Sequence, residues 1–184
     1  MSKTDDAYEI YRKHIYDEEK ISLLQKHKLK VSGSVPSVMW ELFCAVLTGR
    51  SGTGAKGADL TGWEVKSAKQ GSSFEYQYHL KSGEEKLKED CLVNHLFCTY
   101  SETYKDVVVR AIEGKHLAAS FFKKWLPEYK KNYDASAPAN KRRQRFRKAI
   151  SSSYVETHGK IILKITDGAM VKVDNTLLKK LNGK

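Results

Sequence analysis

Three ionisable side chains stand close together within residues 59–66, and their types and spacing could support metal-assisted hydrolysis. Thr61-Gly62 predicts a two-residue hairpin turn, because glycine adopts a positive φ without steric cost. Across such a hairpin Asp59 faces Glu64, and side chains directly opposite on one face lie about 4.5–5.5 Å apart at Cβ. Lys66 follows Glu64 by two residues and projects from the same face. The segment therefore predicts one patch with two carboxylates and an ammonium group.

Two carboxylates this close repel each other, so one tends to stay protonated unless a cation lies between them. Mg²⁺ suits the position, because it prefers oxygen ligands and usually keeps several waters. Bound Mg²⁺ polarises a phosphoryl oxygen and lowers the pKa of a coordinated water, while a nearby lysine stabilises the developing charge. The pattern thus predicts phosphodiester hydrolysis with Mg²⁺ as cofactor. The alternative is an ordinary surface hairpin with a Glu64–Lys66 ion pair.

A predicted helix over residues 36–48 precedes this segment. Pro36 suits its first turn, and Gly49 suits its C-terminal stop. Glu41 is the only charged residue in this apolar run. A buried carboxylate needs a partner or a metal, so Glu41 is a candidate for the same site. The alternatives are a polar flank of the helix or a salt bridge with Arg50.

Basic residues are abundant both near this patch and later in the chain. The loop over residues 48–57 contains four glycines and two cations, which would let it approach a phosphate chain closely. The whole chain carries 33 Lys+Arg against 22 Asp+Glu, a formal net charge of +11, as nucleic-acid binders often do.

Residues 141–148 hold the densest basic stretch, with six cations in eight positions and an expected helical continuation to Ile150. This stretch suits phosphate contacts or base-edge readout by arginine, and a solvated helix face is the alternative. If six phosphates were neutralised, log affinity would fall with log salt at a slope of about −5. The candidate DNA-binding residues are Arg50, Lys56, Lys141, Arg142, Arg143, Arg145 and Arg147.

Together these features resemble the PD-(D/E)XK nuclease superfamily, in particular small type II restriction endonucleases. The resemblance spans roughly residues 34–70 and rests on a glutamate in a helix, a glycine-rich link, Asp59 and the tripeptide Glu64-Val65-Lys66. Ala58 departs from the pattern, because a proline often precedes the aspartate.

Carried over residue by residue, the resemblance implies a set of site residues. Asp59 and Glu64 would be metal ligands, and the backbone carbonyl of Val65 would be another. Lys66 would orient or activate the attacking water. Glu41 matches the supporting acid that many members carry on the first helix.

The implied activity is that of a Mg²⁺-dependent restriction endonuclease cutting double-stranded DNA within or near a short site. A homodimer is implied too, because two-fold symmetry matches a palindromic site. Two alternatives share the same patch: a structure-selective nuclease such as a Holliday-junction resolvase, and the catalytic subunit of a heterodimeric restriction or nicking enzyme with a larger partner. A non-catalytic basic DNA-binding protein, which would ignore metal, is the alternative of another class.

Residues 1–184 are expected to form a single nuclease domain of α/β class. A mixed central sheet would be flanked by helices on both sides, with the active site at one sheet edge. No apolar run reaches membrane-spanning length, and the N-terminus lacks a signal-peptide pattern. The three cysteines form no CxxC motif and fit free thiols in a reducing cytoplasm, and the resemblance implies a bacterial or archaeal one.

Hydrophobic periodicity places the remaining elements. Helices are expected over residues 5–28, capped by Thr4, and over residues 115–133. Strands are expected over residues 74–79, 92–100 and 106–112, with hairpins over 57–68 and 160–173, a turn or short helix over 82–88 and a linker over 134–140. In the strand over 74–79 the aromatic residues share one face, and the other face carries Glu75, Gln77 and His79.

Overall fold

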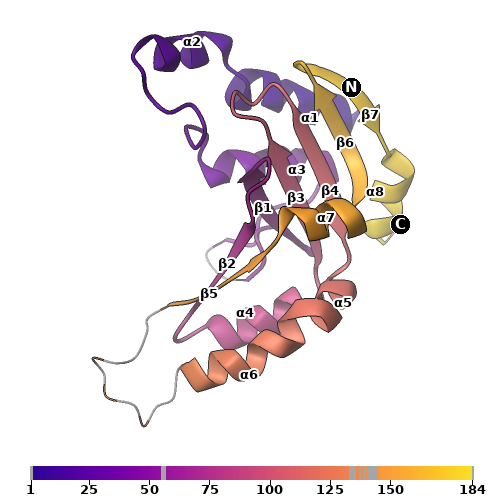
Figure 1. The fold of residues 1–184 in the computed structure, drawn as a ribbon. Coiled ribbons are helices and arrows are strands. Elements are labelled where there is room, and N and C mark those ends of the chain that lie inside the picture. Colours follow the sequence, from indigo (N-terminus) through magenta and orange to yellow (C-terminus); the bar gives the residue numbers. More distant parts are fainter. Residues whose placement is uncertain are drawn as a thin grey trace.

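A mixed five-stranded sheet lies at the centre of the computed structural model, which describes residues 2–54, 57–132, 136, 138, 140 and 145–183. In spatial order its strands are β1 (Trp63–Lys69), β3 (Asn94–Tyr100), β4 (Val107–Ile112), β6 (Lys160–Thr166) and β7 (Ala169–Val173). β1 runs parallel to β3, and the other neighbouring strands are antiparallel. β1 therefore lies at one edge of the sheet (Figure 1).

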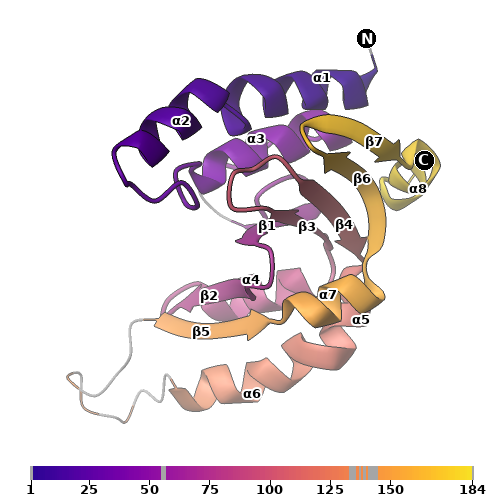
Figure 2. The same cartoon turned by 45° about the horizontal axis from the view of Figure 1, so that its top comes forward.

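Helices near the N-terminus cover one face of this sheet (Figure 2). They are α1 (Lys3–Ile10), the π-helical continuation η1 (Tyr11–Ile15), α2 (Glu18–Lys26) and α3 (Ser37–Thr48). Trp40 and Phe43 of α3 are buried in one cluster with Val65 of β1 and Leu96 of β3. The C-terminal helix α8 (Asn175–Leu181) adds Leu178 to the same cluster.

A two-stranded antiparallel sheet and several helices lie on the other face. The strands are β2 (Phe74–His79) and β5 (Arg145–Ile150), and the helices are α4 (Gly83–Asp90), α5 (Gly114–Leu117), η2 (Ala118–Phe122), α6 (Lys123–Asn132) and α7 (Ser152–His158). Tyr76 and Tyr78 of β2 are buried with Phe97 of the central sheet and Phe122 of η2. Because helices flank the mixed sheet on both sides, the expected α/β fold is confirmed.

Local signals placed several element ends correctly. Gly49 ends α3 in the left-handed conformation with φ +67°. Asp167 and Gly168, with φ of +49° and +76°, form the turn between β6 and β7. The predicted cap Thr4 is wrong, because Ser2 caps α1 through a reciprocal capping box. None of the described helices is long and apolar enough to cross a membrane.

Two larger expectations are wrong. In the hairpin over residues 57–68 only the turn and an isolated bridge form, and β1 pairs in parallel with β3 instead. The expected helical continuation to Ile150 is strand β5, in which Phe146 and Ile150 are buried while Arg145 and Arg147 are exposed. That alternation has the period of a strand, and β5 pairs with β2 so that the buried side chains of both strands share one face. Most of the expected linker and residues 141–144 lie outside the described residues.

Candidate active site

The turn between Leu60 and Trp63 sets the start of the candidate site. The backbones of these two residues exchange two hydrogen bonds, each 2.9 Å long, around Thr61-Gly62. Gly62 has φ +80°, a conformation that residues with a Cβ rarely adopt. The predicted two-residue turn is therefore confirmed, and it folds Asp59 back beside the first residues of β1.

Asp59, Glu64 and Lys66 meet at this edge strand. Asp59 Oδ2 accepts a hydrogen bond of 2.9 Å from the N–H of Val65, and the Asp59 N–H donates to Glu64 Oε2 at 3.3 Å. Lys66 Nζ lies 2.5 Å from Glu64 Oε1. Val65 turns its side chain into the core, so the alternation along β1 leaves Glu64 and Lys66 together on the opposite face.

A second lysine, Lys86 of α4, reaches the same carboxylate and was not among the predicted site residues. Its Nζ lies 2.6 Å from Glu64 Oε2 and 2.6 Å from Asp90 Oδ1. The side chains of Glu64 and Asp90 are only 3% and 1% exposed, so this is a buried ionic network. The sequence signal that could have identified Lys86 was its spacing from Asp90, which places both residues on one face of a helix.

A tyrosine and a histidine hold Asp90 from the interior. Tyr78 Oη donates to Asp90 Oδ2 at 2.8 Å. His95 Nε2 lies 2.8 Å from the carbonyl of Asp90, and its Nδ1 lies 2.9 Å from Tyr76 Oη. A carbonyl can only accept, so Nε2 carries the proton and Tyr76 donates to Nδ1. Burial lowers the pKa of His95 to about 4, which keeps the ring neutral.

The carboxylates of the site differ in how easily they lose a proton. Burial alone would raise the pKa of Glu64, but the ammonium groups of Lys66 and Lys86 outweigh it and lower the pKa to about 2. Burial, reinforced by the charge of Glu64, raises the pKa of Asp59. Burial and the charge of Asp59 also raise the pKa of Glu41. Glu64 is therefore firmly ionised, while Asp59 and Glu41 repel each other and favour a cation nearby.

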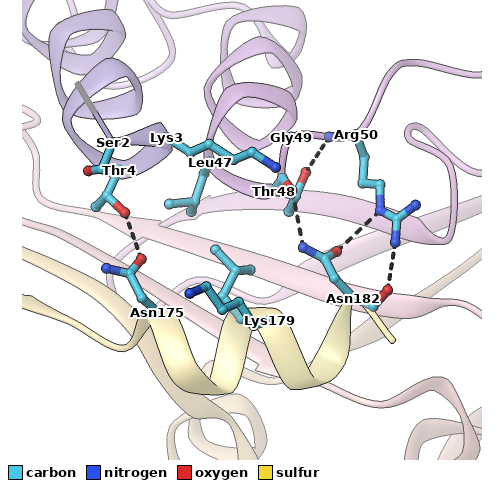
Figure 3. A pocket seen from close by; sticks show the side chains of 11 residues that line it. Ser2, Lys3, Thr4, Leu47, Thr48, Gly49, Arg50, Asn175, Lys179 and Asn182 are labelled. Atoms are coloured by element: carbon cyan, nitrogen blue, oxygen red, sulfur yellow. Dashed lines mark hydrogen bonds between the residues drawn. The ribbon is translucent and has the colours of Figure 1, made fainter. Parts of the chain in front are cut away.

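Arg50, the alternative partner of Glu41, is bound elsewhere. Its Nη2 donates to the carbonyl of Asn182 at 2.6 Å, and its Nε donates to Asn182 Oδ1 at 3.3 Å. Asn182 also accepts from Trp63 Nε1 at 2.9 Å and donates to the carbonyl of Thr48 at 3.1 Å. Thr48, Arg50 and Asn182 border a cavity of about 470 Å³ between the start of α1, the end of α3 and α8 (Figure 3). Arg50 thus anchors the glycine-rich loop to the C-terminal helix.

The donor atoms at the site match the ligands that Mg²⁺ prefers. A residue in an extended strand points its N–H and C=O to the same side. Because the Val65 N–H points to Asp59, its carbonyl faces the same open edge of β1. That edge thus offers a carbonyl beside the carboxylates of Asp59 and Glu64, all hard oxygen donors. The ammonium groups of Lys66 and Lys86 each bind one oxygen of Glu64. Among the described residues, no group of three or more His, Cys, Asp or Glu side chains could hold a metal ion.

A cavity of about 540 Å³ opens beside this network. Its lining combines the loop before Asp59, the polar side of β2 and one side of α4, through Gly57, Gln77, His79, Ser82, Glu85, Lys86 and Glu89. Lys86, whose ammonium group binds Glu64, is therefore one of the residues that line this cavity. Glu85 and Glu89 belong to the same lining, so the cavity carries both signs of charge.

Of the predicted DNA-binding residues, the structure describes Arg50, Arg145 and Arg147. Arg145 and Arg147 lie on the exposed side of β5, while Lys56, Lys141, Arg142 and Arg143 lie outside the described residues. No family model matches the chain, and no curated protein matches it. Its function is therefore inferred from side-chain chemistry and geometry.

Proposed function

We propose that this protein is a Mg²⁺-dependent endonuclease that hydrolyses phosphodiester bonds in double-stranded DNA, as type II restriction enzymes do. One observation carries the proposal: Asp59, Glu64 and Lys66 meet at the edge strand β1. Glu41 approaches from α3, where burial and then the charge of Asp59 raise its pKa. Oxygen donors beside a lysine are the groups that metal-assisted attack on a phosphate requires.

Asp59, Glu64 and the carbonyl of Val65 would hold the Mg²⁺. The ion supplies a Lewis acid that polarises the phosphate and lowers the pKa of the attacking water. Glu64 is charged at neutral pH because Lys66 and Lys86 lower its pKa to about 2, and Mg²⁺ would compete with these ammonium groups for its oxygens. Asp59, whose pKa burial raises, becomes a better ligand once a cation offsets its repulsion from Glu64.

The side chains around the ion orient the water and manage its proton. Lys66 Nζ donates hydrogen bonds to the attacking water and to the charge that develops on the phosphate. Glu41 has a raised pKa and accepts a proton more readily than an ordinary glutamate, which suits a supporting acid or base. The Lys86–Asp90 pair holds Glu64 from the side opposite Lys66.

The charge of the chain supports a polyanionic substrate. A formal net charge of +11 favours association with a phosphate backbone and makes binding dependent on salt. A duplex cut on both strands needs two active sites, so we further propose that the protein acts as a homodimer with one site per strand.

Plasmid cleavage tests the proposal directly. The purified chain should convert supercoiled plasmid to linear DNA with Mg²⁺ and leave it intact with a chelator. Asp59→Asn and Lys66→Ala should each abolish cutting and retain duplex binding in a gel-shift assay, because they alter only the catalytic patch. Lys172→Ala, on the exposed side of β7, is the matched control and should cut normally.

Three outcomes would redirect the assignment. Normal cutting by either site variant would remove the assigned catalytic residues. Binding without any Mg²⁺-dependent cutting would indicate a DNA-binding protein, or a subunit that needs a partner. Cleavage of a four-way junction with no cleavage of linear duplex would indicate a structure-selective nuclease.

A further inference from the structure

The two-stranded sheet of β2 and β5 buries one face and exposes the other. Phe74, Tyr76 and Tyr78 of β2 pack inward, as do Phe146 and Ile150 of β5. The outer face carries polar side chains, and in the cross-strand register Glu75 lies opposite Ala149, Gln77 opposite Arg147, and His79 opposite Arg145. Buried and more exposed positions alternate along both strands, so among the described residues nothing packs over this outer face.

Hydrogen bonds hold the outer side chains in a row. Arg147 Nε donates to Gln77 Oε1 at 3.1 Å and lies 3.9 Å from Glu75 Oε1. Gln77 Nε2 lies 3.3 Å from His79 Nε2. Arg147 uses only Nε in these contacts and its side chain is 55% exposed, so its two terminal NH₂ groups keep their donors for a ligand. The row is ordered in advance and keeps hydrogen-bonding capacity for a ligand.

This row lies beside the catalytic patch. Gln77 and His79 line the cavity of about 540 Å³ that also exposes Lys86. Lys86 binds Glu64, and Lys66 Nζ lies 4.9 Å from the ring centroid of Tyr76, the inward neighbour of Gln77 on β2. Because Tyr76 faces inward, the outer face adjoins the catalytic patch through this cavity, and a duplex that occupied the cavity would lie against Gln77 and His79.

The shape and chemistry of this face match the major groove of a DNA duplex. That groove admits a two-stranded β-ribbon as well as a helix. Arginine pairs in bidentate fashion with guanine O6 and N7, glutamine pairs with adenine N6 and N7, and glutamate accepts from cytosine N4. Gln77, Arg147 and Glu75 are thus three side chains of the types that distinguish base pairs, set side by side on one ribbon.

We propose that the outer face of β2 and β5 is the base-reading surface of the enzyme, with Gln77 and Arg147 contacting base edges in the major groove. The inference rests on the proposed function, which supplies DNA as the substrate, and it adds the residues that recognise the base sequence of that DNA. Arg145, on the same face opposite His79, contributes charge toward the phosphates at the rim.

Selection of binding sites from a random duplex library tests this, in chelator so that no cutting occurs. The wild-type chain should enrich a short consensus. Arg147→Ala and Gln77→Ala should each lose preference at a separate position, weakening binding to the consensus by about 5- to 150-fold. Arg147→Lys should keep the salt dependence of binding yet lose the base preference, because an ammonium group cannot make the bidentate contact.

Arg12→Ala is the matched control. Arg12 is an exposed arginine (60% of its side chain) on η1, paired with Glu9 as Arg147 is paired with Glu75. It should retain the wild-type consensus and affinity. Thermal unfolding of each variant checks that the fold is intact, since surface substitutions of this kind usually change stability by no more than about 0.5 kcal/mol.

The outcomes separate this inference from the proposed function. An unchanged consensus in both variants, or an equal loss of affinity for every sequence, would overturn the inference, and the proposed function would still be supported by plasmid cleavage. A consensus that shifts as expected in a chain that never cuts with Mg²⁺ would uphold the reading surface and overturn the nuclease. Wild-type binding without any sequence preference would also overturn the reading surface.

Discussion

Lys86 binds two buried carboxylates at once, so its replacement by methionine should strongly destabilise the protein. Its Nζ lies 2.6 Å from both Glu64 and Asp90, whose side chains are almost fully buried. Methionine keeps much of the length of the lysine side chain and removes the charge. The variant therefore leaves Asp90 without a cation and leaves Glu64 with Lys66 alone.

The structure gives the size of the effect. Removing one partner of a buried ion pair costs about 3–5 kcal/mol, and we expect the lower half of that range because the Lys86 side chain is 21% exposed. Burial already raises the pKa of Asp90 from 3.8 to about 6 despite Lys86, while Glu64 repels it and Tyr78 donates to it. That rise corresponds to about 3 kcal/mol of stability, present below pH 3.8 and lost as the pH rises through 6.

A double-mutant cycle measured by urea denaturation tests this reasoning. At pH 8, Lys86→Met should lower the free energy of unfolding by about 3–4 kcal/mol. The penalty should shrink at pH 5, because Asp90 then takes up a proton. Adding Asp90→Asn should recover at least about 1 kcal/mol at pH 8, since the amide carries no charge to bury.

Lys88→Met provides the control on the same helix. Lys88 pairs with Glu84 at 2.8 Å, but its side chain is 59% exposed, so the loss should stay below about 1 kcal/mol at both pH values. The reasoning about Lys86 fails if its variant behaves like Lys88→Met, if its penalty is the same at pH 5 and pH 8, or if the two changes in the cycle simply add.

Three further predictions concern the catalytic patch and its supports. Glu41→Gln should slow plasmid cleavage about tenfold and leave duplex binding unchanged, and wild-type kinetics would return Glu41 to a structural role. Asn182→Ala should lower the urea-derived unfolding free energy by about 1–3 kcal/mol, because Trp63 Nε1 loses its acceptor; an unchanged midpoint would contradict this. Gly62→Ala should cost at least about 1 kcal/mol by the same measurement, since its φ is +80°, and stabilisation would refute it.

Short-range signals in the sequence determined the core of the candidate site. The turn at Thr61-Gly62 depends on two residues, and it alone places Asp59 beside Glu64. Period-two alternation placed the aromatic face of β2 inward and Gln77 outward. Gly49 ends its helix because glycine readily adopts the left-handed conformation that closes a helix. These features follow from backbone sterics and side-chain direction within a few residues, so one sequence suffices to predict them.

Only the tertiary structure decided what surrounds that core. Lys86 reaches Glu64 from 22 positions away because α4 packs against β2. The stretch before Ile150 had cations suited to a helix, yet it became a strand because β2 offered an unpaired edge and an aromatic face. Likewise β1 took β3 as its parallel partner rather than the segment just before it. Such pairings depend on which distant segments bury their apolar faces together, and that free energy is a property of the assembled chain rather than of any local pattern.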